Sequence, residues 1–123
     1  MTFFDNIKST KLTNAHGEVN FFRITEGEPD LTGFAEIDAG PQGFVVGHSE
    51  SGHHHVLEAG SVKVMEKVSD GMAILYAIVE NPSELKQAAG DPHKKQIVEP
   101  GTYFITNNCE YDPFTEQARR VAD

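Results

Sequence analysis

The chain has few of the residues that crosslink small proteins or bind nucleic acids. Cys109 is its one cysteine, so it can form neither an intrachain disulfide nor a cysteine-based zinc site. Ten basic residues stand against nineteen acidic ones, and the formal net charge is -9. Because no run of basic residues is present, we do not expect binding to a nucleic-acid backbone. The acidic balance favours solubility or docking onto a basic surface.

Long apolar segments and the common signatures of several enzyme classes are also missing. The longest apolar run, residues 72–79, is far too short to cross a bilayer as a helix. The first residues do not place a charged segment before an apolar one, so we expect no signal peptide. The chain has no P-loop, no dinucleotide-binding glycine motif and no Gly-x-Ser-x-Gly motif. The sequence therefore indicates neither a nucleotide-dependent enzyme nor a serine hydrolase of these kinds.

The chain does contain a series of short segments with the pattern of β-strands. With 38% hydrophobic residues, 123 residues are enough for one globular core. β-Branched and aromatic residues predict strands over residues 19–25, 43–46, 53–57, 61–68, 72–79 and 102–106. Turn-forming residues separate several of these segments, at 40–43, 69–71 and 99–102. The short strands and close spacing are typical of an antiparallel fold.

Two segments carry signals for the start of a helix. Asn81 can cap a helix whose first position is Pro82, and Gly90 can end it. The segment from Asp112 to Arg120 also has a proline in its first turn and predicts a final short helix.

Together these elements predict a mainly β fold. We expect an antiparallel barrel or a jelly-roll-like sandwich with one or two short helices. Residues 1–16 show little periodicity and are interpreted as an N-terminal arm. Residues 17–123 are interpreted as a single β domain that ends in a short C-terminal helix or arm.

A run of histidines is the most distinctive local feature. His53, His54 and His55 are consecutive, and His48 lies five residues before them. Side chains alternate between the two faces of a strand, so His53 and His55 should share one face and His54 the other. Imidazole is the commonest metal ligand among side chains. His93, which lies on a distant loop, can close over the same face as a third ligand.

Three interpretations of these histidines remain open. The first is a divalent metal site, with zinc as the expected ion, formed by His53, His55 and His93 with His48 and Glu58 in reserve. The second is a structural role, either in a solvated loop or stacked at a subunit contact. The third is a pH sensor, because imidazole changes its charge near neutral pH.

Part of the sequence resembles the cupin pattern. The matching residues are Gly47, His53, His55, Glu58 and the Pro100-Gly101 turn. The glutamate comes earlier than in that family, and the histidine expected after the Pro-Gly turn is missing between Tyr103 and Asn108. This partial resemblance implies an alternative function, a cupin-like metal-binding protein or metalloenzyme that uses His53, His55 and His93.

Both ends of the chain carry aromatic residues suited to contacts. Phe3, Phe4 and Ile7 can anchor an arm against a neighbouring subunit or against the chain's own core. The C-terminal end pairs an aromatic residue with two adjacent arginines that can meet carboxylates on a partner. A docked terminal helix with solvated charges is the alternative. The residues that we predict to contact a partner are Phe3, Phe4, Phe114, Arg119 and Arg120.

The order of motifs from residue 17 to residue 123 resembles small proteins of phage and prophage gene sets. The matching segments are Gly17-Glu18-Val19, Gly52-His53-His54-His55, His93, Pro100-Gly101-Thr102-Tyr103, Glu110-Tyr111-Asp112-Pro113 and Arg119-Arg120-Val121-Ala122-Asp123. Members often carry a second histidine three residues before the one that matches His93, where this chain has Gly90. The resemblance implies a viral or mobile-element setting and does not imply a reaction.

These observations lead to an expected function. We expect a non-enzymatic structural protein of a virus particle, a capsid decoration (cement) subunit that stabilises the head shell. Its partner would be the major capsid protein, and a homo-oligomer, with a trimer favoured, would lie on the capsid exterior after synthesis in the host cytoplasm. Terminal arms that bind a repeating lattice can turn many weak contacts into stable attachment. No nucleic-acid or membrane partner is expected.

Overall fold

The computed structural model describes residues 4–16, 19–47, 54–69, 72–87 and 95–107, which form ten β-strands and no helix. The strands are β1 (Ile7–His16), β2 (Val19–Gly27), β3 (Ala35–Glu36), β4 (Phe44–Gly47), β5 (His55–Leu57), β6 (Val62–Ser69), β7 (Met72–Val79), β8 (Ser83–Gln87), β9 (Gln96–Val98) and β10 (Gly101–Asn107). Within this described part, no helix could span a membrane.

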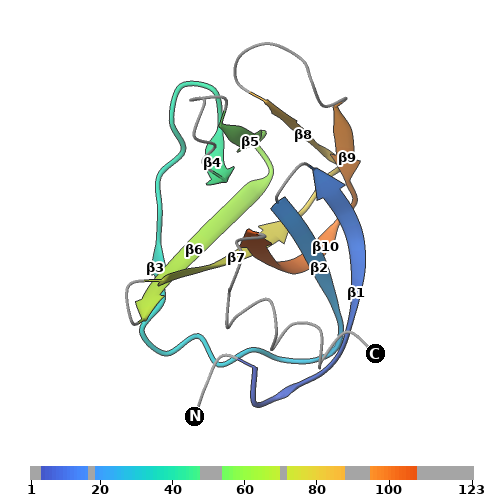
Figure 1. Cartoon of the computed structure of the whole chain (residues 1–123), viewed down its shortest axis with the longest axis vertical. Helices are drawn as coiled ribbons and strands as arrows, with labels where there is room; N and C mark the ends of the chain where they lie inside the picture. Colours follow the sequence, from blue (N-terminus) through green and yellow to red (C-terminus); the bar gives the residue numbers. More distant parts are fainter. Residues whose placement is uncertain (1–3, 17–18, 48–53, 70–71, 88–94, 108–123) are drawn as a thin grey trace.

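The strands form two antiparallel sheets. The larger sheet has the order β1-β2-β10-β7-β6-β3, and the smaller one has the order β4-β5-β8-β9. Figure 1 shows the four-stranded sheet at the upper end of the view, with β3 and the start of β1 toward the lower end. The described residues therefore form an all-β, sandwich-like fold without a closed barrel.

The first hydrophobic core joins the two sheets. Phe21 and Tyr103 come from the six-stranded sheet, whereas Leu57 and Leu85 come from the four-stranded sheet, and all four are 0% exposed. The Phe21 and Tyr103 rings meet edge to face, with their centroids 5.9 Å apart. Burial of each such side chain contributes about 1.5–3 kcal/mol, so this cluster is a main source of stability.

A second hydrophobic core covers the opposite face of the six-stranded sheet. Phe22, Phe104 and Tyr76 are directly opposite one another on β2, β10 and β7. Phe104 stacks on Phe22 and meets Phe4 edge to face, with ring centroids 5.1 Å apart in both pairs. The partly buried side chains that complete this cluster include Leu31 and Phe34. Since both faces of this sheet are apolar, β7 is a nearly continuous hydrophobic run.

Most of the strands that the sequence predicts are present. β2, β4, β5, β6, β7 and β10 coincide with the six predicted segments to within a few residues. β6 and β7 pair up to Ser69 and Met72, as expected for a hairpin with a turn between them. Of the two predicted architectures, the closed barrel does not match the described sheets, which are sandwich-like; the jelly-roll-like connectivity stays a prediction.

The prediction of a helix from Asn81 to Gly90 is wrong, because Ser83–Gln87 forms strand β8. Ser83 and Leu85 are buried, whereas Glu84 and Lys86 are partly exposed, which is the two-residue period of a strand. β8 pairs with β5 on one side and β9 on the other, and these pairings outweigh the local helix signal. The other predicted helix, residues 112–120, lies outside the described residues.

The segment interpreted as an N-terminal arm contributes a strand to the sheet. Residues 7–16 form β1, which pairs with β2 along its length. The pairing shifts register at three places, between Ile7 and Ser9, between Ser9 and Thr10, and between Leu12 and Asn14. These irregularities interrupt the two-residue period that would have revealed the strand.

Asn14 links the edges of the two sheets. Its Nδ2 donates to Oε1 of Gln96 and to the carbonyl oxygen of Ile97, both at 3.1 Å. Nε2 of Gln96 in turn donates to the carbonyl oxygen of Ala15 at 2.7 Å. These bonds connect β1 with β9, which lie side by side in Figure 1.

Replacement of Asn14 by alanine is expected to lower the free energy of unfolding by about 0.5–1.5 kcal/mol, because the link to β9 loses two part-buried hydrogen bonds. The loss should be measured by urea denaturation, with the exposed Asn6 replaced by alanine as a matched control. Equal unfolding midpoints for the two variants would show that the link between the sheets contributes nothing.

Two buried tyrosines make stability depend on alkaline pH. Burial raises the pKa of Tyr76 above its ordinary value of 10.0, with Glu28 adding to the shift and a hydrogen bond with Thr102 opposing it. Burial also raises the pKa of Tyr103, which Arg23 opposes and Glu99 reinforces. The unfolded chain therefore loses these protons at a lower pH than the folded chain does.

The contribution of these two tyrosines to stability should accordingly be fully present below the ordinary tyrosine pKa and fall as the pH rises through the folded values. Unfolding midpoints between about pH 9 and pH 11 will measure this fall. Tyr76→Phe keeps the ring and removes one ionisable group, so the stability of this variant should fall less with rising pH. An unchanged slope in that variant would contradict the assignment.

Candidate functional site

The structure describes two residues of the histidine run, and they lie on opposite faces of the four-stranded sheet. His55, the first residue of β5, is 3% exposed and pairs with Gly47 of β4. His54 is partly exposed and lines a surface pocket with Val45 and Val56. The predicted alternation of faces is therefore confirmed for this pair.

The surroundings of His55 leave room only for glycine at position 47. A Cβ atom on Gly47 would lie 2.3 Å from Cγ2 of Val19, 2.9 Å from Oδ1 of Asn107 and 3.3 Å from Cδ2 of His55. The imidazole of His55 is thus enclosed where the two sheets approach each other, beside β2 and β10.

The predicted zinc site stays a prediction. Of its three ligands, His55 is described, whereas His53 and His93 lie outside the described residues, as does the reserve ligand His48. Glu58, the other reserve, is exposed, and its Oε1 accepts the backbone N–H of Glu84 at 3.2 Å. Residues 4–16, 19–47, 54–69, 72–87 and 95–107 contain no group of three His, Cys, Asp or Glu side chains that could hold a metal ion.

The structure describes one of the five predicted partner contacts. Phe4 is 4% exposed and packs in the second hydrophobic core against Phe104. The sequence left two alternatives for the N-terminal aromatic residues, contact with a neighbouring subunit or packing on the chain's own core. Phe4 packs on the chain's own core. The remaining predicted contacts, which lie outside the described residues, are Phe3, Phe114, Arg119 and Arg120.

A pocket of about 250 Å³ lies between the turn at residues 40–43 and the strands β4 and β5. We call it the turn pocket; its lining is Gly40, Pro41, Gln42, Gly43, Val45, His54 and Val56. Val45 and Val56 are directly opposite each other on β4 and β5 and form its apolar side. Val45 is 37% exposed there, which is high for a large apolar side chain on a sheet.

The wall of the turn pocket is fixed by two glycines. The N–H of Gly40 donates to the carbonyl of Gly43 at 2.9 Å, and the reverse bond is 3.2 Å long. Gly43 has a φ of 128°, which favours glycine, and a Cβ atom there would lie 2.4 Å from the carbonyl oxygen of Leu57. The turn therefore packs directly against the backbone of β5.

Charged residues extend from the turn pocket across the same face of the sheet. Lys86 of β8 is directly opposite Val56, and Glu84 is opposite Ile97. Oε2 of Glu84 lies 4.0 Å from Nζ of Lys95. Among the described residues, Lys86 has no carboxylate within the same distance.

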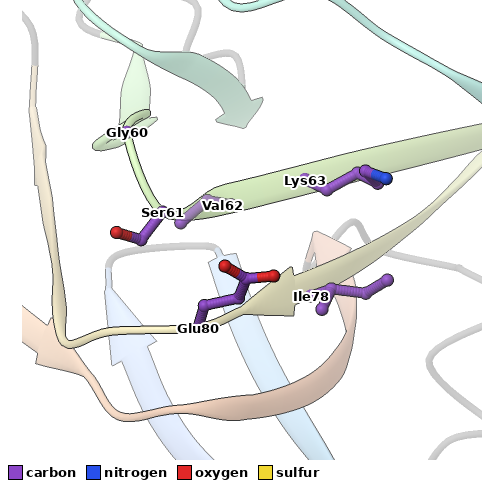
Figure 2. A pocket seen from close by; sticks show the side chains of 6 residues that line it. All are labelled: Gly60, Ser61, Val62, Lys63, Ile78 and Glu80. Carbon is purple, nitrogen blue, oxygen red and sulfur yellow. The ribbon is translucent and has the colours of Figure 1, made fainter.

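A second pocket, of about 240 Å³, lies where β6 begins and β7 ends. Figure 2 shows its lining residues, Gly60, Ser61, Val62, Lys63, Ile78 and Glu80. Oγ of Ser61 accepts a hydrogen bond from Nδ2 of Asn81 at 2.9 Å, and Nζ of Lys63 is 4.0 Å from Oε1 of Glu36. Its polar groups are thus partly engaged in contacts within the protein.

The sequence predicts the turn at residues 40–43 and the run of histidines, but it does not predict the turn pocket. The pocket requires the turn, β4 and β5 to meet, and Lys86 joins them only because β8 is a strand paired with β5.

One comparison with known proteins yields a match. A family model described as a domain of unknown function (DUF8820) matches residues 15–108. No curated protein and no solved structure matches the chain. The matched segment begins near the end of β1 and ends just after β10, so it contains most of both sheets.

Proposed function

The chain belongs to the family described as a domain of unknown function (DUF8820), and we propose that it is a capsid decoration (cement) protein. In this proposal it has no catalytic activity and binds the outer surface of a virus capsid, where it holds neighbouring copies of the major capsid protein together. It acts as a homo-oligomer, with a trimer favoured.

The observation that carries the proposal is the packing of the six-stranded sheet. Apolar side chains fill both of its faces, one against the four-stranded sheet and the other beneath Phe4 and the segment that contains Leu31 and Phe34. A sheet that is buried on both faces is a rigid support, and it leaves the outer surfaces and the chain ends to make contacts. Rigid scaffolds with contacting ends suit attachment to a repeating lattice.

Two features of the sequence add support. The net charge of -9 favours docking onto a basic surface. The ordered motifs, including Pro100-Gly101-Thr102-Tyr103, resemble those of small phage and prophage proteins.

Co-sedimentation of the purified chain with capsids of a virus whose genome encodes it tests the proposal. The structure guides the choice of variants, because deletion of residues 1–8 would also remove Phe4 and Ile7 from the second hydrophobic core. Deletion of residues 1–3 avoids this loss. Capsid binding should weaken after that deletion and in Phe114→Ala and Arg119→Ala, whereas Arg23→Ala, an exposed arginine on β2, is the matched control.

Saturable binding of the unaltered chain is the expected result, at a fixed ratio to the major capsid protein. Failure of the folded chain to sediment with capsids would overturn the proposal. Equal binding by all variants would support decoration but contradict the assigned contact residues.

A further inference from the structure

The turn pocket has the shape of a site for a small molecule. Its apolar side is the cross-strand pair of Val45 and Val56, and its wall is the doubly bonded turn between Gly40 and Gly43. At about 250 Å³ it lies just below the range of about 300–1,000 Å³ that is typical for drug-sized ligands. The space therefore suits a ligand of a few heavy atoms rather than a nucleotide or a larger cofactor.

The wall is preorganised, which lowers the entropy cost of binding. The carbonyl of Leu57 and a methyl group of Val56 leave no space for a side chain at position 43. The turn consequently holds its place against β5, and the pocket exists before any ligand enters it.

The charges beside the pocket identify the polar end of the ligand. Lys86 shares the face of Val56 and lies directly opposite it, a separation of about 5 Å between Cβ atoms in such pairs. Of the described carboxylates near Lys86, that of Glu58 accepts the backbone N–H of Glu84 and that of Glu84 lies 4.0 Å from Nζ of Lys95. Among the described residues, Lys86 has no carboxylate within 4.0 Å of its ammonium group, and it is the cation beside the pocket from which we argue the charge of the ligand.

His54 adds a polar group to the lining of the pocket. Its ring lies on the same side of the sheet as Val56. A lysine beside an apolar surface is suited to a ligand that joins a carboxylate to a hydrocarbon group.

We propose that the turn pocket binds a small branched aliphatic carboxylate. The alkyl group lies against Val45 and Val56, and the carboxylate points toward Lys86. This site is independent of capsid decoration, and its test does not involve capsids.

The experiment is an NMR titration of the full chain with isovalerate, observing the methyl groups of Val45 and Val56. These signals should shift in a saturable way, with a dissociation constant on the order of 1 mM for a ligand of this size. Isoamyl alcohol keeps the alkyl group without the charge, and acetate keeps the charge without the alkyl group. Both should bind more weakly, and isoamylamine, which has the opposite charge, should bind weakest.

Two lysine variants provide a matched comparison. Lys86→Met should weaken isovalerate binding about tenfold, because it removes a charge-assisted contact, while leaving isoamyl alcohol binding unchanged. Lys95→Met, on the same sheet but already near Glu84, should leave both affinities unchanged. Val45→Thr keeps the shape of the side chain but makes it polar, so it should weaken the binding of both isovalerate and isoamyl alcohol.

Three results would overturn the proposal. The first is a linear, non-saturating response of the Val45 and Val56 methyl groups to isovalerate. The second is binding of isoamylamine as tight as that of isovalerate. The third is the same isovalerate affinity in Lys86→Met and Lys95→Met, with both variants folded as judged by their NMR spectra.

Discussion

Replacement of Phe104 by alanine is expected to lower the free energy of unfolding by about 3–5 kcal/mol. Phe104 is 0% exposed and lies at the centre of the second hydrophobic core, stacked on Phe22 and edge to face with Phe4. Its loss removes a large apolar surface and leaves a cavity on the face of the sheet that Phe4 covers. The measurement is urea denaturation followed by circular dichroism.

Val68→Ala is the matched control for this prediction, because Val68 is 63% exposed. A surface substitution of this kind should change stability by less than about 0.5 kcal/mol. Similar losses in the two variants would mean that the second core does not stabilise the fold.

The same core offers a test of where Phe4 lies in solution. Edge-to-face aromatic pairs contribute about 0.5–1.5 kcal/mol beyond their buried area. A double-mutant cycle with Phe4→Ala and Phe104→Ala should show a coupling of that size. Additive losses would indicate that Phe4 does not pack on Phe104 and is free to contact a partner.

Replacement of Gly43 by alanine is the second large effect that we expect, a loss of about 2–5 kcal/mol. Two costs combine at this position. The φ of 128° is unfavourable for any residue with a Cβ atom, and that atom would lie 2.4 Å from a backbone oxygen that cannot move without shifting β5. Because Gly43 also lines the turn pocket, isovalerate binding should be lost in any fraction of the variant that still folds.

Gly60→Ala separates the two costs. Gly60 has a φ of 94°, but a Cβ atom there would meet nothing within 4 Å. This control should lose only about 1–2 kcal/mol, the cost of the backbone conformation alone. If thermal or chemical denaturation gives the same loss for both glycines, the contact between the turn and β5 is not as close as described.

The strands that could be predicted from the sequence are those whose side chains alternate without interruption or are apolar on both faces. In β6, Val62 and Val64 point to the first core while Lys63 is exposed, so the pattern is visible locally. β7 is buried on both sides and stands out as a continuous apolar run.

The strands that were missed lack such a pattern for physical reasons. In β1 the buried positions are Ile7, Thr10 and Asn14, because register shifts displace the side chains and two of the three are polar. β8 begins just after a proline, and Oγ of Ser83 donates to the carbonyl oxygen of Asn81 at 2.9 Å. Residues 81–83 resemble the start of a helix in sequence, but in the structure they lead into a strand. β3 and β9 are two and three residues long, too short to show a period.

The candidate site also has one part that could be predicted from the sequence and one part that could not. The alternation of His54 and His55 follows from strand geometry and was predicted. The turn pocket depends on which strands pair. Lys86 lies near it because β8 pairs with β5, where Lys86 is opposite Val56, a residue thirty positions earlier in the chain. The pairing of distant segments is not visible in any local pattern, so the sequence alone does not predict the pocket.

The most direct test of the central claim, the proposed attachment to a capsid exterior, is quantitative mass spectrometry of virus particles purified from a culture that expresses this chain. The account predicts that the chain is present at a constant ratio to the major capsid protein and is accessible to proteases on intact particles. Particles that form normally and contain none of the chain, with all of it recovered in the soluble fraction, would contradict the account.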